Sequence, residues 1–307
     1  MKPGTGMSNT WDYRFAFRAE RRDDVPVEFR SAYDRLLEAW GPPIFGLFSP
    51  AMEDPGFIVS RWHPPKLILV FSESLTVLSL DRHSDQVVTY ELNRQDSLGY
   101  GVADFLLNCW LTLYPGASPD SGMQIRFPSR ASQHYVELAR LLLNWLECQW
   151  EPGLNQDPPS CAIPGLPPKL SSCLEAHPEF GPAKEFFFQP TIELRKTRGE
   201  KWANLLLAIT PKGIVAFTDQ YRRDCSPYGI EITYLRLARV RSVDWCESSD
   251  GRRAAIEVHL GGVNIGLCQK WPILPGLNPY ALRWIEAVKS QVKVMAKEYD
   301  RPAGLMG

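Results

Sequence analysis

Residues Leu67 to Asp81 read LILVFSESLTVLSLD, and residues Leu205 to Asp219 read LLLAITPKGIVAFTD. The two stretches align without a gap: an apolar run, Ser72 against Thr210, a short polar turn, a second apolar run, and Asp81 against Asp219. Two apolar runs on either side of a turn predict a β-hairpin in each half of the chain. A period of roughly 140 residues is too long for a solenoid, so it predicts two copies of one domain.

The sequence around the two hairpins repeats as well. Each hairpin is followed by a strand-like segment that ends in Thr-Tyr, at Thr89-Tyr90 and at Thr233-Tyr234. Each half then closes on a helix with an apolar stripe, over residues 132–147 and 279–294, in which Leu142 and Ile285 are predicted core residues. A helix that follows all of its strands cannot make the crossovers that parallel strands need. The predicted fold class is therefore α+β, mainly antiparallel β.

This order of elements resembles the pleckstrin-homology-like (PH-like) superfold, in which two roughly orthogonal sheets are plugged by a C-terminal helix. The resemblance covers about residues 44–147 and 184–295, and it rests on element order and on the internal repeat, without a diagnostic motif. It implies two PH-like β-barrel or β-sandwich domains, each closed by its C-terminal helix. Members of the superfold mostly bind phosphoinositide headgroups, peptides or other proteins, and few are catalytic. The resemblance thus implies a binding module, and the fold alone does not fix the ligand.

The segments outside the two repeats complete the predicted domain organisation. Residues 1–43 are expected to form an N-terminal extension, with a strand near Phe17 and a helix that begins after Pro26 and stops at Gly41. Residues 148–183 hold eight prolines and predict a linker with one helical turn at 170–175. Residues 296–307 are expected to be a C-terminal tail. The two domains are accordingly placed at 44–147 and 184–295.

Composition narrows the class of protein. The chain has 307 residues and a formal net charge of −1, with basic and acidic residues interspersed, which disfavours a nucleic-acid binder. Its N-terminus lacks the apolar core of a secretory signal, and no stretch is apolar for long enough to span a bilayer. Seven cysteines without a C-x-x-C pair predict reduced, mostly buried thiols. These features favour a cytoplasmic protein without a transmembrane segment.

One candidate binding site can be named from the sequence. Four basic residues gather in the predicted hairpin between the first two strands of the second half: Arg195, Lys196, Arg198 and Lys201. In phosphoinositide-binding members of the resembled superfold this loop carries a Lys-x-Arg pattern, which Lys196 and Arg198 match. Guanidinium and ammonium groups on a turn can gather phosphate oxygens. Glu193 and Glu200 dilute the positive charge, so two interpretations stay open: a solvated hairpin tip, or an anion-binding site for an acidic lipid headgroup.

The sequence assigns no catalytic residue, metal ligand or cofactor. Cys161, Cys173 and His177 are spaced C-x11-C-x3-H, which matches no standard zinc site, and no fourth ligand lies nearby. No nucleophile signature, phosphate-binding loop or dinucleotide fingerprint is present. Among the tryptophans, Trp284 is expected in the core, whereas Trp62, Trp202 and Trp271 are candidates for an exposed recognition anchor.

The sequence therefore favours a non-catalytic binding or scaffolding protein. Its partner would be a peptide or protein that docks along a sheet edge or beside a C-terminal helix. The alternative is recognition of an anionic, phosphoinositide-like headgroup or membrane surface through residues 195–201. A second alternative is an enzyme with an unrecognised site at the domain interface.

Overall fold

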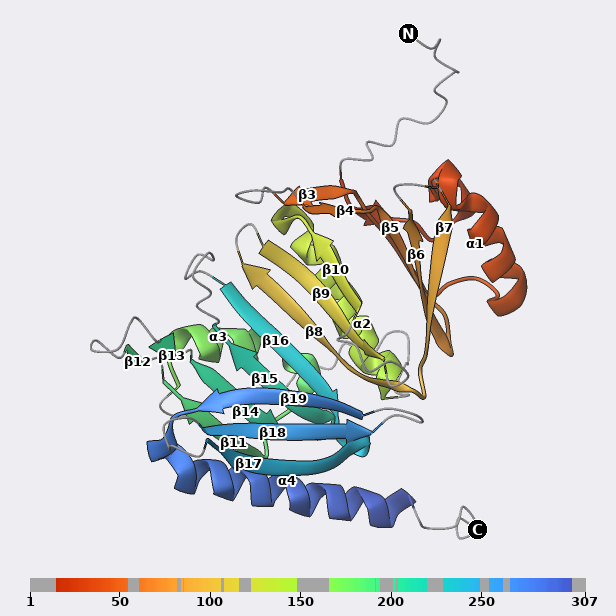
Figure 1. Cartoon of the computed structure of the whole chain (residues 1–307). Coiled ribbons are helices and arrows are strands. Elements are labelled where there is room, and N and C mark those ends of the chain that lie inside the picture. Colours follow the sequence, from red (N-terminus) through yellow and green to blue (C-terminus); the bar gives the residue numbers. More distant parts are fainter. Residues whose placement is uncertain are drawn as a thin grey trace. The chain divides into compact units, whose positions relative to one another are not determined.

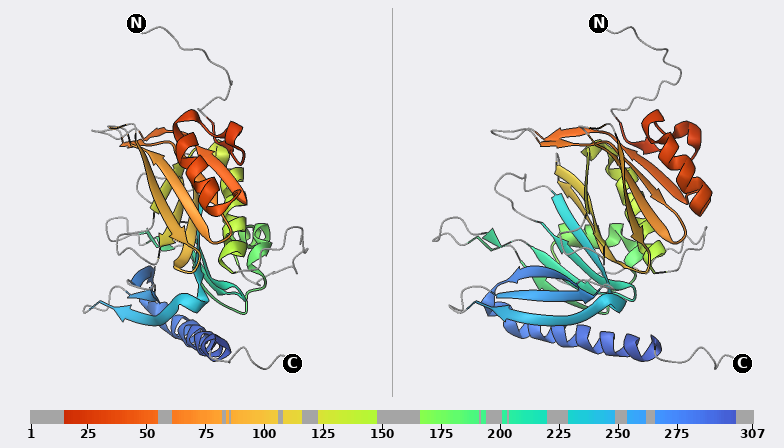
Figure 2. Two further views of the ribbon diagram at one scale, coloured as in Figure 1. Left: turned by 90° about the vertical axis from the view of Figure 1, so that its right-hand side faces the viewer. Right: turned by 45° about the vertical axis from the view of Figure 1, so that its right-hand side comes forward.

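The computed structural model describes residues 15–54, 61–81, 84, 86–105, 108–115, 123–147, 166–190, 192–193, 201–202, 204–219, 229–248, 254–261 and 266–299. The chain divides into two compact units. The first comprises Met1–Glu91 and Arg126–His134, and the second comprises Leu92–Ile125 and Tyr135–Gly307. Figure 1 labels the elements of both units, and Figure 2 shows them from two further directions.

The first unit is built on a five-stranded sheet with the order β1-β2-β5-β6-β7. Its strands are β1 (Phe17–Arg18), β2 (Phe45–Ser49), β5 (Lys66–Val70), β6 (Ser74–Leu80) and β7 (Val87–Asn93). Helix α1 (Val27–Trp40) follows Pro26 and ends at Gly41, as its sequence predicts. Its Phe29 and Tyr33 are buried in one cluster with sheet residues such as Phe48. A short hairpin, β3 (Met52–Asp54) with β4 (Arg61–His63), lies between β2 and β5 in the chain.

A seven-stranded sheet with the order β10-β9-β8-β16-β15-β14-β11 runs through the second unit. Its strands are β8 (Ser97–Phe105), β9 (Asn108–Pro115), β10 (Met123–Phe127), β11 (Glu185–Gln189), β14 (Leu205–Ile209), β15 (Gly213–Thr218) and β16 (Gly229–Arg236). The central pairing joins β8 to β16, two strands that are far apart in the sequence, in antiparallel orientation. Strands from both halves of the chain therefore share one sheet.

A three-stranded antiparallel sheet, in the order β17-β18-β19, completes the β part of the second unit. It consists of β17 (Val240–Glu247), β18 (Ala254–Gly261) and β19 (Gly266–Ile273). Helix α4 (Asn278–Tyr299) packs against it, and Trp284, Ile285 and Val288 of the helix are buried in one core with residues of both sheets. The burial of Ile285 confirms its predicted place in the core.

Two further helices belong wholly or mainly to the second unit. Helix α2 (Ser132–Leu146) buries Leu138, Ala139 and Leu142, which confirms the predicted apolar stripe. Helix α3 (Pro168–Ala176) lies where the sequence predicts a linker with a single helical turn. The helix is longer than the predicted turn at 170–175, and the burial of Leu170 and Leu174 stabilises it.

The same order of elements occurs twice along the chain. The first repeat runs from α1 through β2–β10 to α2, and the second runs from α3 through β11–β19 to α4. In each repeat a short hairpin, β3–β4 or β12 (Ile192–Glu193) with β13 (Lys201–Trp202), interrupts the first long hairpin. The segment 1–43, predicted as an extension, thus contains a helix in the same place in the order as α3.

The hairpin alignment made from the sequence is displaced by one residue. The Phe71 amide donates to the Ser74 carbonyl in the first turn, and the Thr210 amide donates to the Gly213 carbonyl in the second. Phe71, and not Ser72, therefore corresponds to Thr210. A shift of one residue exchanges the two faces of a strand, so the alignment by residue type assigned each side chain to the wrong face.

Two other expectations need correction. The described strands are mainly antiparallel, as predicted, but none of their sheets closes into a barrel. The domains 44–147 and 184–295 stay a prediction, and in the described strands β8 and β9 share a sheet with β16. Trp271 is buried in the core and is not an exposed anchor, Trp62 is half-buried, and the side chain of Trp202 lies outside the described part. Within the described part of the chain, no helix combines the length and the hydropathy needed to cross a bilayer.

Candidate functional site

Strand β17 lies at one edge of its sheet in the described part of the chain. In the described strands of its sheet β17 has β18 on one side and no strand on the other. Helix α4 packs beside it, as Figure 1 shows, and the Glu247 carboxylate links the two elements. That carboxylate accepts hydrogen bonds from Trp245 Nε1 and from Asn278 Nδ2, both at 2.8 Å. The end of β17 is thereby fixed to the first residue of α4.

The corresponding strand of the first repeat, β8, is already paired. Strand β16 lies along it in a ladder that runs from Gly229 opposite Phe105 to Leu235 opposite Gly99. The Tyr100 and Tyr234 rings are 5.4 Å apart between centroids. Gly99, with φ of 159°, allows this approach, since a Cβ atom there would lie 2.0 Å from the Tyr234 carbonyl oxygen.

Strand β16 also contacts the end of helix α2. The Tyr234 hydroxyl hydrogen-bonds to the carboxylate of Glu147, the residue after α2, and Arg236 Nε lies 3.6 Å from the same carboxylate. Lys212, in the turn before β15, donates from Nζ to Asn144 Oδ1 at 3.2 Å. Burial lowers the pKa of Lys212, and the charge of Glu147 opposes that shift. Burial and then the Glu147 charge raise the pKa of Tyr234 well above its usual range, so it remains a protonated donor.

A shared irregularity aligns β8 with β17. The pairing of β8 with β9 shifts register between Ser97 and Gly99, and the pairing of β17 with β18 shifts between Val240 and Ser242. A β-bulge therefore occurs at the same place near the start of each strand, so Ser97 corresponds to Val240. By this correspondence the second repeat presents the edge and the helix that hold β16 in the first repeat.

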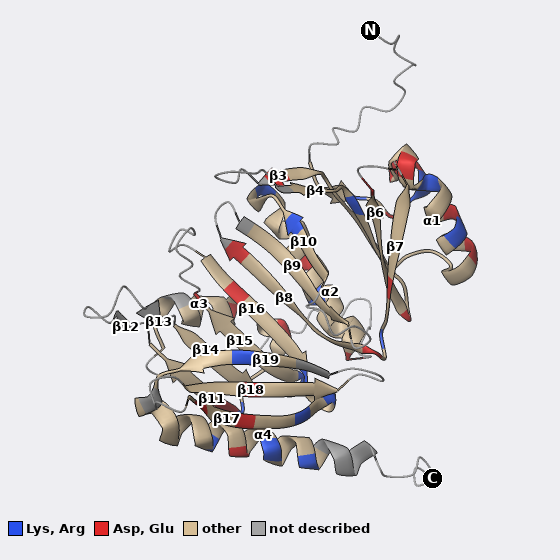
Figure 3. Cartoon of the chain, in the orientation of Figure 1, with Lys and Arg blue, Asp and Glu red and all other residues tan. Residues whose placement is uncertain are grey.

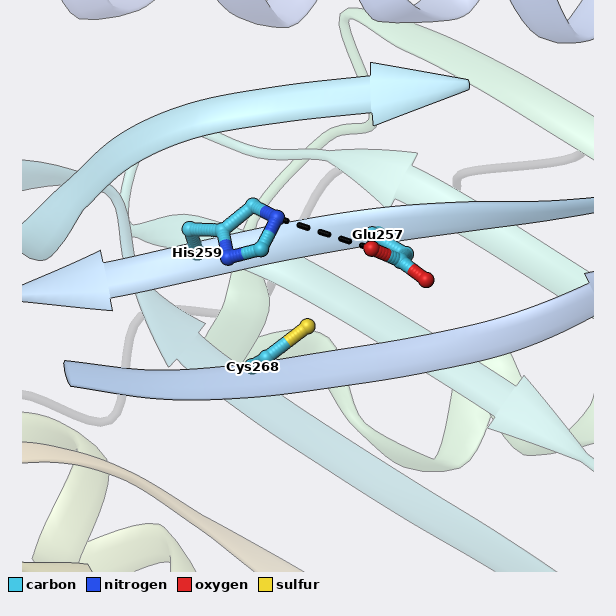
Figure 4. A group of neighbouring side chains, drawn as sticks. All are labelled: Glu257, His259 and Cys268. Carbon is cyan, nitrogen blue, oxygen red and sulfur yellow. Dashed lines mark ion pairs between the residues drawn. The ribbon is translucent and has the colours of Figure 1, made fainter. Parts of the chain in front are cut away.

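The outer face of the same three-stranded sheet carries polar side chains. Glu257 and His259 alternate on β18, and Cys268 lies directly opposite His259 on β19 (Figure 4). Their potential ligand atoms all lie within 4.8 Å of one another. Lys270 forms an ion pair with Glu257, and the Cys246 thiol hydrogen-bonds to the same Glu257 carboxylate. These two hydrogen bonds, that from Lys270 first, lower the pKa of the Glu257 carboxyl.

Imidazole, thiolate and carboxylate groups suit a cation such as Zn²⁺ bound with an open fourth position. Two features oppose metal binding at this group. Lys270 already neutralises Glu257, and burial followed by the Glu257 charge raises the pKa of the Cys268 thiol. A metal would have to displace an ion pair and a proton, and both costs reduce its affinity. The sequence alone does not reveal this group, because the pairing of His259 with Cys268 depends on strand register. The available signal was Glu257-x-His259 beside a cysteine-containing strand.

The basic residues predicted from the sequence lie mostly outside the described residues. This holds for Arg195, Lys196 and Arg198, whereas the backbone of Lys201 pairs with Glu193 where β13 meets β12. The side chain of Lys201 is also outside the described part. Of the rejected metal ligands, Cys161 is not described, and His177 Nδ1 lies 2.8 Å from Glu179 Oε1.

The described cysteines correct a further expectation. Cys109 is buried, but Cys173 and Cys246 are half-buried and Cys268 is exposed. The expectation of mostly buried thiols therefore holds for one of these four. Comparison with known proteins adds no family, since no family model, curated protein or solved structure matches the chain.

Proposed function

We propose that this chain is a non-catalytic binding protein made of two PH-like repeats, and that it binds an extended polypeptide segment as an added strand on the edge of β17, beside α4. One observation carries the proposal. In the first repeat the corresponding edge, β8, holds strand β16 next to the end of α2. The chain thus contains an example of the binding mode, with the second repeat acting as the ligand of the first.

The element order of each repeat supports the PH-like part of the proposal. Strands β2, β5, β6 and β7 are neighbours in one sheet, and β8, β9 and β10 are neighbours in another, before α2 ends the repeat. In the second repeat β11, β14, β15 and β16 are neighbours, as are β17, β18 and β19, before α4. Four strands, three strands and a C-terminal helix is the order of the superfold that the sequence resembles.

The physical basis of binding would be the backbone of β17. An edge strand presents a row of amide and carbonyl groups that can pair with another chain. Main-chain hydrogen bonds supply affinity in such complexes, and alternate side chains supply specificity. On the helix side, the exposed residues of α4 include both signs of charge, as Arg283, Glu286 and Lys293 show (Figure 3). A partner strand would therefore be selected by its own charges and not by a uniform patch.

A peptide with the sequence of Gly229–Leu235, GIEITYL, is a suitable probe because these residues form the internal ladder with β8. We expect the labelled peptide to bind to the purified chain, measured by fluorescence anisotropy at a concentration where the chain is monomeric. Hydrogen–deuterium exchange should slow in residues 240–247 on binding. Strand β19, at the opposite edge of the same sheet, is the internal control and should not change.

A control peptide carries proline in place of both Ile232 and Thr233. Alternate residues of a strand point their N–H groups to opposite sides, so one of the two prolines must remove a donor from the receiving edge. This peptide should bind at least about tenfold more weakly, since a lost backbone hydrogen bond and a proline clash combine. Equal binding of both peptides, or protection that appears away from β17, would contradict strand addition.

A further inference from the structure

Each repeat contains one strand whose edge can accept a further strand, and one strand that can pair with such an edge. Strand β8 of the first repeat receives β16 of the second. Their counterparts are β17, which would receive, and β7, which would insert. Both lie at the edges of their sheets in the described strands.

We propose that β7 of one molecule pairs with the edge of β17 in another molecule of the same chain, so that the internal β8–β16 pairing is repeated between molecules. This inference rests on the proposed function and names its partner as a second copy of the chain. It commits to an antiparallel ladder, because β8 and β16 are antiparallel.

The correspondence between the repeats predicts the register of the new ladder. Three residues separate β7 from β8 and three separate β16 from β17, so Asn93 corresponds to Arg236. Leu92 then corresponds to Leu235, and both are buried. Transferring the pairs of β8 and β16 places Glu91 opposite Val243 and Thr89 opposite Trp245. We expect the ladder to end at Val243, because the next position holds Ser242 where the first repeat has Gly99.

The transferred register also places the exposed apolar side chains of β7. Val88 and Tyr90 are 38% and 47% exposed. In the transferred register Tyr90 lies opposite Asp244 and Val88 lies opposite Cys246. These two β17 residues belong to the outer face of the three-stranded sheet, so Val88 and Tyr90 would lie beside them on that face.

The charged residues near the C-terminal helix differ in sign between the internal interface and the proposed one. The burial patterns of α2 and α4 align Leu138 with Trp284 and Leu142 with Val288, which places Lys293 where the first repeat has Glu147. The turn hydrogen bonds place Glu73 where the second repeat has Lys212. The register places Glu91 where the second repeat has Tyr234.

The inversion preserves attraction across the interface. In the internal interface the acidic Glu147 faces Tyr234, Arg236 and the basic Lys212. In the proposed interface the basic Lys293 would face the acidic Glu91 and Glu73. Opposite charges favour the contact and fix its register, whereas like charges oppose it.

The proposed contact joins two different surfaces, the β7 edge of one molecule and the β17 edge of another. A dimer therefore still has one unpaired β7 edge and one unpaired β17 edge. Assembly of this kind continues until a ring closes or a filament forms. The chain is therefore expected to form species larger than a dimer as its concentration rises.

The test is a charge exchange followed by analytical ultracentrifugation across a dilution series. Lys293→Glu and Glu91→Lys should each weaken assembly by about tenfold or more, because each puts like charges in contact. The double variant Lys293→Glu/Glu91→Lys should regain assembly. An equimolar mixture of the two single variants should also assemble, since every junction between unlike molecules then joins opposite charges. Arg283→Glu, an exposed change elsewhere on α4, is the matched control and should assemble like the wild type.

The outcomes separate this inference from the proposed function. A wild-type chain that stays monomeric across the series, or single variants that assemble normally, would overturn self-association. If the GIEITYL peptide still protects β17 in that case, strand addition stands with another partner. Single variants that fail and are rescued neither by mixing nor by the double exchange would also overturn the proposed register, since rescue depends on the Glu91–Lys293 contact.

Discussion

The Tyr234 hydroxyl hydrogen-bonds to the carboxylate of Glu147, and this bond joins a strand of the second repeat to the end of the last helix of the first. The two residues are distant in sequence, and Tyr234 is fully buried. A buried carboxylate contact of this kind stabilises the fold mainly because its loss leaves a polar group without a partner. It also indicates which contacts matter when a strand is held beside a C-terminal helix.

Tyr234→Phe removes the hydroxyl and keeps the ring. We expect the free energy of unfolding to fall by about 1–3 kcal/mol, because Glu147 loses a donor in a half-buried place. Chemical denaturation measures this change. Tyr280→Phe is the control, since Tyr280 is exposed and should give no measurable loss. Equal midpoints for the two variants would show that the Tyr234–Glu147 bond contributes nothing to stability.

Gly99→Ala tests the close approach of β16 to β8. The new Cβ would lie 2.0 Å from the Tyr234 carbonyl oxygen, and φ of 159° is strained for a residue with a side chain. We expect a loss of stability of about 1–3 kcal/mol or more. Gly276→Ala is the matched control, because nothing lies within 4 Å of a Cβ there. A thermal midpoint for Gly99→Ala at the wild-type value would mean that β8 and β16 do not pair as described.

Leu142→Ala and Ile285→Ala test the two C-terminal helices as core elements. Both side chains are almost fully buried, so each truncation should cost roughly 2–5 kcal/mol through lost burial and a cavity. Leu282→Ala, on the exposed side of α4, should cost far less. Denaturation midpoints that do not distinguish Ile285→Ala from Leu282→Ala would contradict the packing of α4.

Thiol labelling tests the described cysteines. Cys268 is exposed and should react in the native protein, whereas Cys109 is buried and should react only after unfolding. Burial and the Glu257 charge raise the pKa of the Cys268 thiol, so its labelling should speed up as the pH rises. Peptide mapping by mass spectrometry identifies the labelled sites. Native labelling of Cys109 at the rate of Cys268 would contradict the burial of β9.

The headgroup alternative remains a prediction from the sequence. Replacement of Lys196 and Arg198 by alanine should abolish any salt-sensitive binding to acidic liposomes, because each basic residue near an anionic surface contributes about 1 kcal/mol. A cosedimentation assay at two salt concentrations measures this, with Lys289→Ala on α4 as the control. A wild-type chain that ignores acidic liposomes at low salt would eliminate this alternative.

The sequence predicts the local elements well because they depend on apolar period. The apolar stripes of α2 and α4 and the hairpin at Leu205 can be predicted without any tertiary information. The displaced alignment of Ser72 with Thr210 has a different origin. Both turns tolerate several polar residues, so residue type alone does not fix which amide closes the turn.

Long-range pairing could not be predicted. Nothing in the local sequence of β8 distinguishes a strand that stays within its own repeat from one that pairs with β16, since both need the same alternation. The free edge of β17 could not be predicted for the same reason. The pairing of His259 with Cys268 could not be predicted because it depends on cross-strand register. Helix α3 was underestimated because its prolines suggest a loop, although a proline at the first helical position favours a helix.

The pairing of β8 with β16 has a consequence for how the chain is made. During synthesis β8 leaves the ribosome long before β16 exists, and at usual elongation rates the delay is on the order of ten seconds. Throughout that interval the edge of β8 and the Tyr100 ring lack the strand that covers them in the finished sheet. A nascent chain in that state is open to pairing with a neighbouring nascent chain, so a fragment that ends at residue 147 should aggregate where the whole chain folds.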